Sequence, residues 1–184
     1  DEFSFLRGIT NKPKKITIPS PTMMSYYFVR GISDKVYRKP MKFLQEATQI
    51  LKQGVVELER IGASYIQIDA PEFGMLLDPI QQEWFANKGF NPDSLIKEGA
   101  EMINEVFSAF HGTKALHICR GNDKNRFMAS GGYEKIAQTV FRKANVDRFL
   151  LEFDSERAGD FSPLRHIPKN KIVVLGLITT KSSR

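Results

Sequence analysis

Short runs of apolar residues, many of them β-branched, recur along the chain and are separated by longer, more polar stretches. Apolar runs of roughly 4–8 residues bounded by proline, glycine or polar residues are typical of buried strands. Five such runs occur in succession along the chain and predict strands near residues 15–19, 65–69, 115–119, 149–153 and 172–178.

Between these runs the apolar residues recur every three or four positions, which is the spacing of one helix face. The pattern covers residues 43–58, 95–110 and, more briefly, 133–144. Gly62 is a suitable C-terminal stop for the first helix, and Asp93–Ser94 predict the N-cap of the second. Strands that alternate with helices indicate an α/β fold with a parallel sheet. The length of 184 residues, without a repeat or linker, favours one domain, 1–184.

Polar residues stand at or just after the C-terminal end of every predicted strand. They are Ser20, Asp69, His117 with Cys119, Glu152 with Asp154, and Thr179 to Lys181. In parallel α/β folds this edge of the sheet faces the ligand. Polar residues after one strand could be ordinary loop chemistry, but five in succession predict the rim of an active site.

His117 and Cys119, the only cysteine of the chain, are two positions apart in a predicted strand. Alternate strand residues point to the same side, so the two side chains should lie one above the other. A thiolate beside a neutral imidazole is a zinc ligand pair that needs one or two further ligands. A buried cysteine that happens to neighbour a hydrogen-bonded histidine is the alternative.

Composition narrows the functional classes. The chain is 41% hydrophobic and 26% charged, as in ordinary globular proteins. Its net charge of +6 comes from scattered Lys and Arg, with no basic stripe between aromatic residues, so we expect no nucleic-acid partner. No run reaches the roughly 20 apolar residues of a membrane span, and no signal peptide is visible. A single cysteine fits a reducing compartment, so we expect a cytoplasmic protein.

Four ordered motifs carry a family resemblance: residues 66–71 (IQIDAP), 117–122 (HICRGN), 151–161 (LEFDSERAGDF) and 174–181 (VLGLITTK). Together they resemble the catalytic C-terminal barrel of cobalamin-independent methionine synthase, in particular its shorter single-barrel relatives. The resemblance covers essentially the whole chain. It implies a (β/α)8 TIM barrel, of which about the last five βα units are present, because five strands do not close such a barrel.

The resemblance also implies the chemistry. Zinc would be held by His117, Cys119 and Glu152, and would keep a substrate thiol deprotonated near neutral pH. A methyl group would pass from 5-methyltetrahydrofolate to homocysteine, giving methionine. Asp69 matches the family's catalytic aspartate, which binds the homocysteine ammonium, and Glu72 is a weaker candidate for substrate binding on the folate side. For Asp69 the alternative is an aspartate that caps the following turn. For Glu152 the alternative is a solvated carboxylate, because Asp154 and Glu156 compete for the role of third ligand.

Two departures from the family pattern leave other functions open. The family takes a fourth zinc ligand, a cysteine, from a later loop, and its first strands have no counterpart here. The chain would then be a fragment, a degenerate relative, or one of several chains that complete a barrel. Unpaired sheet edges would favour a homo-oligomer. The alternatives in function are another zinc-dependent thiol alkyltransferase, of the epoxyalkane:coenzyme M transferase type, and a non-catalytic barrel that acts as a binding module.

Overall fold

The centre of the fold is one sheet of five parallel strands. The structure is a computed structural model, which describes residues 2–122, 124 and 126–181 of the chain. The strands are β1 (Ile16–Pro19), β2 (Tyr65–Asp69), β3 (Thr113–Ile118), β4 (Arg148–Glu152) and β5 (Ile172–Gly176). They lie in chain order, and all four neighbouring pairs are parallel. The five predicted strands are therefore confirmed, with ends displaced by at most two residues. Residues 1, 123, 125 and 182–184 of the predicted domain lie outside the described residues.

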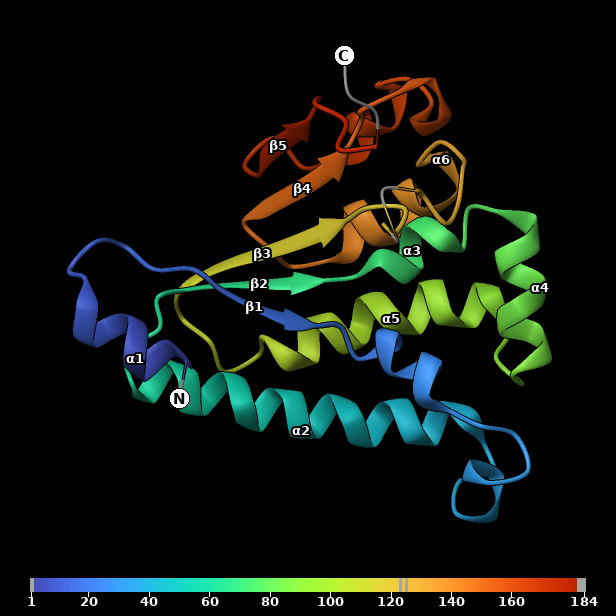
Figure 1. Cartoon of the computed structure of the whole chain (residues 1–184), viewed down its shortest axis with the longest axis horizontal. Helices are drawn as coiled ribbons and strands as arrows, with labels where there is room; N and C mark the ends of the chain where they lie inside the picture. Colours follow the sequence, from blue (N-terminus) through green and yellow to red (C-terminus); the bar gives the residue numbers. More distant parts are fainter. Residues whose placement is uncertain (1, 123, 125, 182–184) are drawn as a thin grey trace.

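Helices precede the first strand and connect the others. They are α1 (Glu2–Ile9), α2 (Pro40–Arg60), α3 (Pro71–Met75), α4 (Pro79–Asn87), α5 (Pro92–Val106) and α6 (Glu134–Ile136). Short 3₁₀ helices are η1 (Thr22–Tyr27), η2 (Ser33–Lys35), η4 (Glu156–Ala158) and η5 (Ser162–His166), and η3 (Ala137–Phe141) is a π-helix that continues α6. Figure 1 shows α2 and α5 running side by side along the sheet, and the two helices contact each other.

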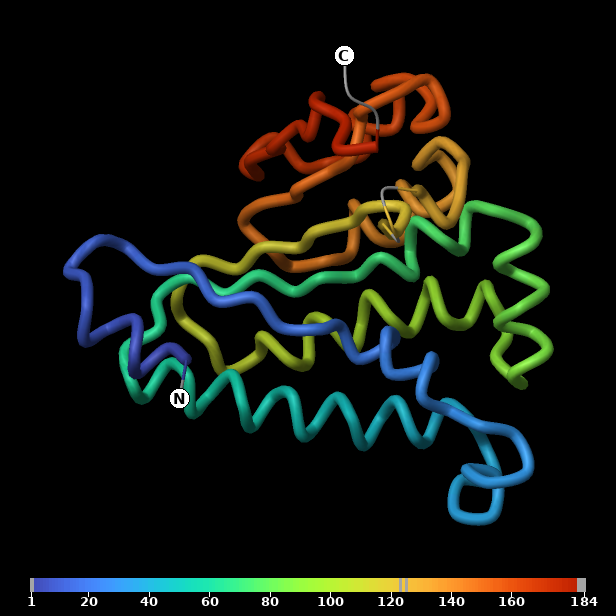
Figure 2. Tube along the Cα trace, in the orientation of Figure 1, coloured from blue at the N-terminus to red at the C-terminus, as the bar shows by residue number. Residues whose placement is uncertain are grey.

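The order of the strands decides the type of α/β fold. A doubly wound sheet reverses its strand order part-way, whereas strands that keep chain order throughout are those of a (β/α)8 barrel. The sheet runs from β1 to β5 without a reversal, so the fold is an incomplete TIM barrel. The tube in Figure 2 follows the same path, from α1 beside the end of α2 to β5 at the far edge of the sheet.

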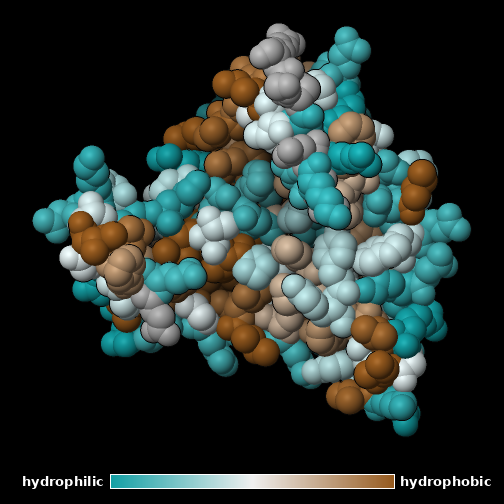
Figure 3. Space-filling view, viewed as in Figure 1, coloured by the Kyte–Doolittle hydropathy of each residue, from teal (hydrophilic) through white to brown (hydrophobic). Residues whose placement is uncertain are grey.

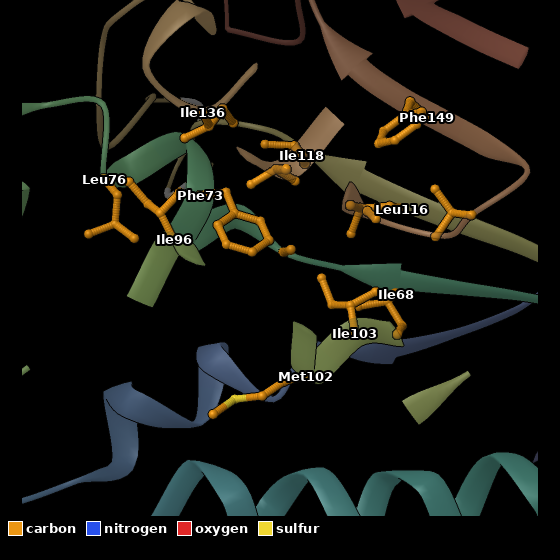
Figure 4. Close-up of a cluster of buried hydrophobic side chains, with 14 of the residues drawn as sticks. Ile68, Phe73, Leu76, Ile96, Met102, Ile103, Leu116, Ile118, Ile136 and Phe149 are labelled. Carbon is orange, nitrogen blue, oxygen red and sulfur yellow. The ribbon is translucent and has the colours of Figure 1, made fainter. Parts of the chain in front are cut away.

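Strand alternation gives the sheet two unlike faces. Ile68, Leu116 and Phe149 are register partners across three strands, and all three are fully buried. Figure 4 shows them in the apolar cluster that also contains Ile103 of α5. The next residues along these strands point to the opposite side, and this second set includes Asp69 and His117.

β5 is much less covered than the other strands. Ile172, Val174 and Leu175 are each more than a third exposed, as are Leu177 and Ile178 just beyond the strand. In Figure 3 apolar residues gather over the part of the molecule where β5 lies in Figure 1. The strand therefore presents an open, apolar edge of the kind that pairs with further polypeptide.

Two helix predictions need correction. The second helix begins at Pro92, because the Asn91 side chain accepts a hydrogen bond from Ser94 N and makes Asn91 the N-cap in place of Asp93–Ser94. The third predicted helix is only α6 and the π-helix η3. No helix of the described residues is long and apolar enough to cross a membrane.

Candidate functional site

A cavity of about 360 Å³ opens at the C-terminal ends of β3, β4 and β5. His117, Cys119 and Glu152 all line it, which is where the sequence predicts a zinc site. Leu150, Val174 and Ile178 supply apolar walls, and Asp154 and Lys181 supply charge. The cavity combines a thiol, an imidazole and a carboxylate with an apolar lining, as ligand sites commonly do.

Asp69 lies beside His117. The two residues are register partners on β2 and β3, and Asp69 Oδ1 is 3.0 Å from His117 Nδ1. Burial would raise the pKa of Asp69, but hydrogen bonds from His117 and Gln67, together with the nearby charge of Lys15, lower it below its ordinary value. An ionised carboxylate at this nitrogen fixes the orientation of the ring, as it does for many metal-binding histidines.

Cys119 follows β3 directly and is partly buried. Burial raises the pKa of its thiol, and the negative charges of Glu152, Asp69 and Glu72 add to the increase. Without a cation, the side chain is therefore a thiol at neutral pH. The helix α3 packs tightly on the Cys119 backbone, because a Cβ on Gly74 would lie 1.9 Å from Cys119 O.

Glu152 is held by cations. Its Oε1 lies 2.5 Å from Arg157 Nη2 and 2.6 Å from Lys181 Nζ, and its Oε2 accepts from Arg120 N at 2.7 Å. The same two cations also bind Asp154. Burial would raise the pKa of Glu152, but these hydrogen bonds and charges lower it. The sequence alone did not identify Arg157 or Lys181 as partners of Glu152.

Arg120, next to Cys119, has a fully buried guanidinium, a role that sequence reasoning missed. It donates to Gly131 O, Glu152 O, Ala158 O and the Tyr133 hydroxyl, and stacks 4.2 Å from the Tyr133 ring centroid. Its presence inside the HICRGN motif was the available signal, but nothing in the sequence shows that it is buried. Arg120 ties the segment after Cys119 to the end of β4.

The donor set fits zinc in part. His117 and Cys119 are a nitrogen and a sulfur donor on one side of β3, and Asp69 supports the histidine. Glu152 lines the same cavity, but its carboxylate is occupied by Arg157 and Lys181 and would have to exchange a cation for the metal. Among residues 2–122, 124 and 126–181, no group of three or more His, Cys, Asp or Glu side chains is already arranged to hold a metal ion.

Glu72 does not line the cavity. It belongs to α3, has no exposed surface, and its Oε1 accepts hydrogen bonds from Ser20 Oγ and Thr22 Oγ1, both at 2.6 Å. Burial raises its pKa to about 7, although the two hydroxyl hydrogen bonds oppose the increase. Its expected part in substrate binding remains a prediction, and what the structure shows is a buried acid.

Sequence comparisons relate the chain to two uncharacterised proteins and, more distantly, to a methionine synthase. No family model matches the chain. Two uncharacterised proteins of Bacillus subtilis, YxjH and YxjG, are 32% and 33% identical over 98% of the chain. A methionine synthase of Pyrococcus furiosus is 22% identical over the whole chain. The chain spans about half the length of these curated relatives, between 45% and 49%.

Solved structures show the same fold. A Listeria monocytogenes protein, provisionally named a vitamin-B12-independent methionine synthase, matches 95% of the chain with a TM-score of 0.68 and 28% identity. A B12-independent methionine synthase of Shewanella sp. W3-18-1, solved in complex with selenomethionine, matches 95% of the chain with a TM-score of 0.71 and 24% identity. The chain has the fold of part of their barrels. It covers 49% and 47% of those chains, which agrees with an incomplete barrel.

Proposed function

We propose that this chain belongs to the cobalamin-independent methionine synthase family and supplies the zinc-binding part of a methyltransferase site. The reaction is methyl transfer from 5-methyltetrahydrofolate to the thiol of homocysteine. The observation that carries the proposal is that His117, Cys119 and Glu152, from two adjacent strands, line one cavity at the ligand-facing edge of the barrel. The similarity in fold to proteins named as methionine synthases supports it.

His117, Cys119 and Glu152 would hold the zinc, with one position left for a further ligand or the substrate. Bound zinc stabilises a thiolate and so keeps the substrate sulfur nucleophilic near neutral pH. Glu152 would be a ligand only if Lys181 or Arg157 left its Oε1, where both cations bind in the structure. Asp154, which binds the same cations, can retain them in that state.

The remaining residues of the cavity bind and orient. Leu150, Val174 and Ile178 form apolar walls that suit the methylene groups of a thiol substrate. Asp69 holds His117 through Oδ1, and Oδ2 accepts no hydrogen bond from the described part of the chain. That oxygen is available for the homocysteine ammonium, the role that the family resemblance implies for Asp69.

In the complete reaction the substrate thiol loses its proton and its sulfur forms a bond to the methyl carbon. The bond between that carbon and N5 of the folate breaks, its electron pair stays on N5, and N5 takes a proton. A cytoplasmic location is part of the proposal, because a zinc-binding Cys119 must stay reduced. A thiol alkyltransferase with another donor would use the same zinc chemistry, so the choice of thiol has to be decided by product analysis.

Metal content tests the proposal. We expect the purified chain to bind close to one zinc per molecule, measured by elemental analysis after removal of free metal. Cys119→Ser and His117→Asn should lose most of it, whereas His111→Asn, at a highly exposed histidine away from the cavity, should retain it. Cobalt in place of zinc should give a thiolate charge-transfer band that Cys119→Ser removes.

Zinc binding that is absent from the wild-type chain, or that survives in both ligand variants, would contradict the proposal and favour a non-catalytic binding module. If zinc binds, mass spectrometry of products decides the substrate. Methionine formed from homocysteine and 5-methyltetrahydrofolate supports the methyltransferase, and an alkylated coenzyme M formed from an epoxide supports the alternative alkyltransferase.

A further inference from the structure

A row of hydrogen bonds leads from the start of β1 to His117 along one face of the sheet. Lys15 Nζ donates to Gln67 Oε1 at 2.9 Å, and Gln67 Nε2 donates to Asp69 Oδ1 at 2.6 Å. Asp69 Oδ1 in turn lies 3.0 Å from His117 Nδ1. The backbone dictates the row, because residues 67 and 69 share a face of β2 and Asp69 is the register partner of His117.

Each member of the row sets the orientation of the next. An ammonium group only donates, so Lys15 holds the Gln67 side chain with its oxygen toward Lys15 and its amide NH₂ toward Asp69. The carboxylate only accepts, so both groups that approach Oδ1 must donate. His117 Nδ1 therefore carries its proton, and in the neutral ring the lone pair stands on Nε2.

Gln67 is the residue that links Lys15 to Asp69 in this row. Its side chain is nearly buried, with 7% of the residue exposed, and both ends of its amide are hydrogen-bonded within the row. Without the Gln67 amide, Asp69 would keep a single partner and could rotate away from His117. The remaining exposed part of Asp69 would then be free to bind water instead.

We propose that Gln67, oriented by Lys15, is a positioning residue that holds Asp69 so that His117 presents Nε2 as its only donor atom. The inference deepens the proposed function and rests on it for the identity of the ligand that Nε2 binds. The tautomer of His117 itself is independent of any metal. Outer groups of this kind typically change metal affinity about 10–100-fold when they are removed.

The tautomer can be measured directly. Long-range ¹H–¹⁵N correlation of the labelled, metal-free chain at a pH where the imidazoles are neutral distinguishes protonated from unprotonated ring nitrogens, and loss of the signal in His117→Asn assigns it. We expect the wild-type His117 to be protonated at Nδ1. Gln67→Met, which keeps the length of the side chain but removes the amide, should give a mixture of both tautomers.

Two further variants make the test specific. Gln53→Met, at an exposed position on α2, is the matched control and should leave the spectrum of His117 unchanged. Lys15→Met, at an exposed residue that should not impair folding, frees the Gln67 amide to turn over and should also give mixed tautomers. A wild-type His117 protonated at Nε2, or a Gln67→Met spectrum like that of the wild type, would overturn the proposal.

Zinc affinity separates this inference from the proposed function. Competition with a chelator should show zinc bound about 10–100-fold more weakly by Gln67→Met than by the wild-type and Gln53→Met chains. If the wild-type chain binds no zinc, the proposed function fails while the tautomer still decides the role of Gln67. If zinc binds equally to all three chains and the tautomer is unchanged, the positioning role fails alone.

Discussion

Glu72 offers the sharpest test of the electrostatics of this fold. Its carboxyl group is fully buried, Oε1 accepts from Ser20 and Thr22, and Oε2 is buried without a partner in the described residues. Burial, assisted by the negative charge of Asp69, raises its pKa from 4.5 to about 7. The folded chain therefore keeps a proton on Glu72 that the unfolded chain has already released.

The sign and size of the effect follow from that shift. Below pH 4.5 both states carry the proton, and Glu72 does not oppose folding through ionisation. Between pH 4.5 and about 7 the unfolded state ionises first, so stability falls as pH rises. A difference of about 2.5 pKa units corresponds to about 3 kcal/mol lost across this window.

Glu72→Gln removes the titration but keeps an oxygen that can accept from Ser20 and Thr22. We expect the free energy of unfolding of this variant, measured by urea titration followed by circular dichroism, to lack this downward slope. The wild-type chain should therefore lose about 3 kcal/mol relative to Glu72→Gln between pH 4.5 and 7. Glu101→Gln, at an exposed position of α5, is the control and should follow the wild-type curve. Parallel curves for the wild type and Glu72→Gln would refute the reasoning.

Three further predictions concern packing and association. Arg120→Met should lower the free energy of unfolding, measured by urea titration, by about 3 kcal/mol or more, because the carbonyls that Arg120 binds lose their donors. A decrease of less than about 1 kcal/mol would contradict this prediction. Gly74→Ala should lower the free energy of unfolding by about 1–3 kcal/mol, because the new Cβ would overlap the carbonyl oxygen of Cys119. A more stable variant in the same assay would contradict this and show that α3 can move away from Cys119. The 184-residue chain should self-associate through the exposed edge of β5, as measured by analytical ultracentrifugation, and Val174→Arg should weaken the association. A wild-type chain that stays monomeric at all concentrations would contradict this prediction.

Much of the fold could be predicted from the sequence because its strands are short apolar runs with clear limits. The run at 65–69 matches β2 at both ends, and the alternation with helices predicts a parallel sheet. The start of α5 differs from the prediction, because the sequence offers adjacent capping residues and the structure uses Asn91, followed by Pro92 as the first helical residue. The π-helix η3 could not be predicted, since its apolar spacing resembles that of an ordinary helix.

The sequence predicts which strand-end residues form the candidate site, but it does not predict which of their side chains pair with one another. His117, Cys119 and Glu152 were expected in one pocket, and all three line the same cavity. The contact between Asp69 and His117 depends on the register of two strands that are distant in sequence, which a single sequence does not specify. The pairing of Glu152 with Lys181 depends in the same way on how the segment after β5 folds back.

The buried guanidinium of Arg120 has a consequence for how the molecule opens. One side chain binds the carbonyls of Gly131, Glu152 and Ala158, three segments that are separate in sequence. If any one of these segments unfolds, the Arg120 guanidinium loses a hydrogen-bond partner and becomes exposed to water together with its other partners. The three segments should therefore unfold as one cooperative unit. In native-state hydrogen exchange, amides such as Gly131 N and Phe153 N should therefore report a common opening energy, although they belong to different segments.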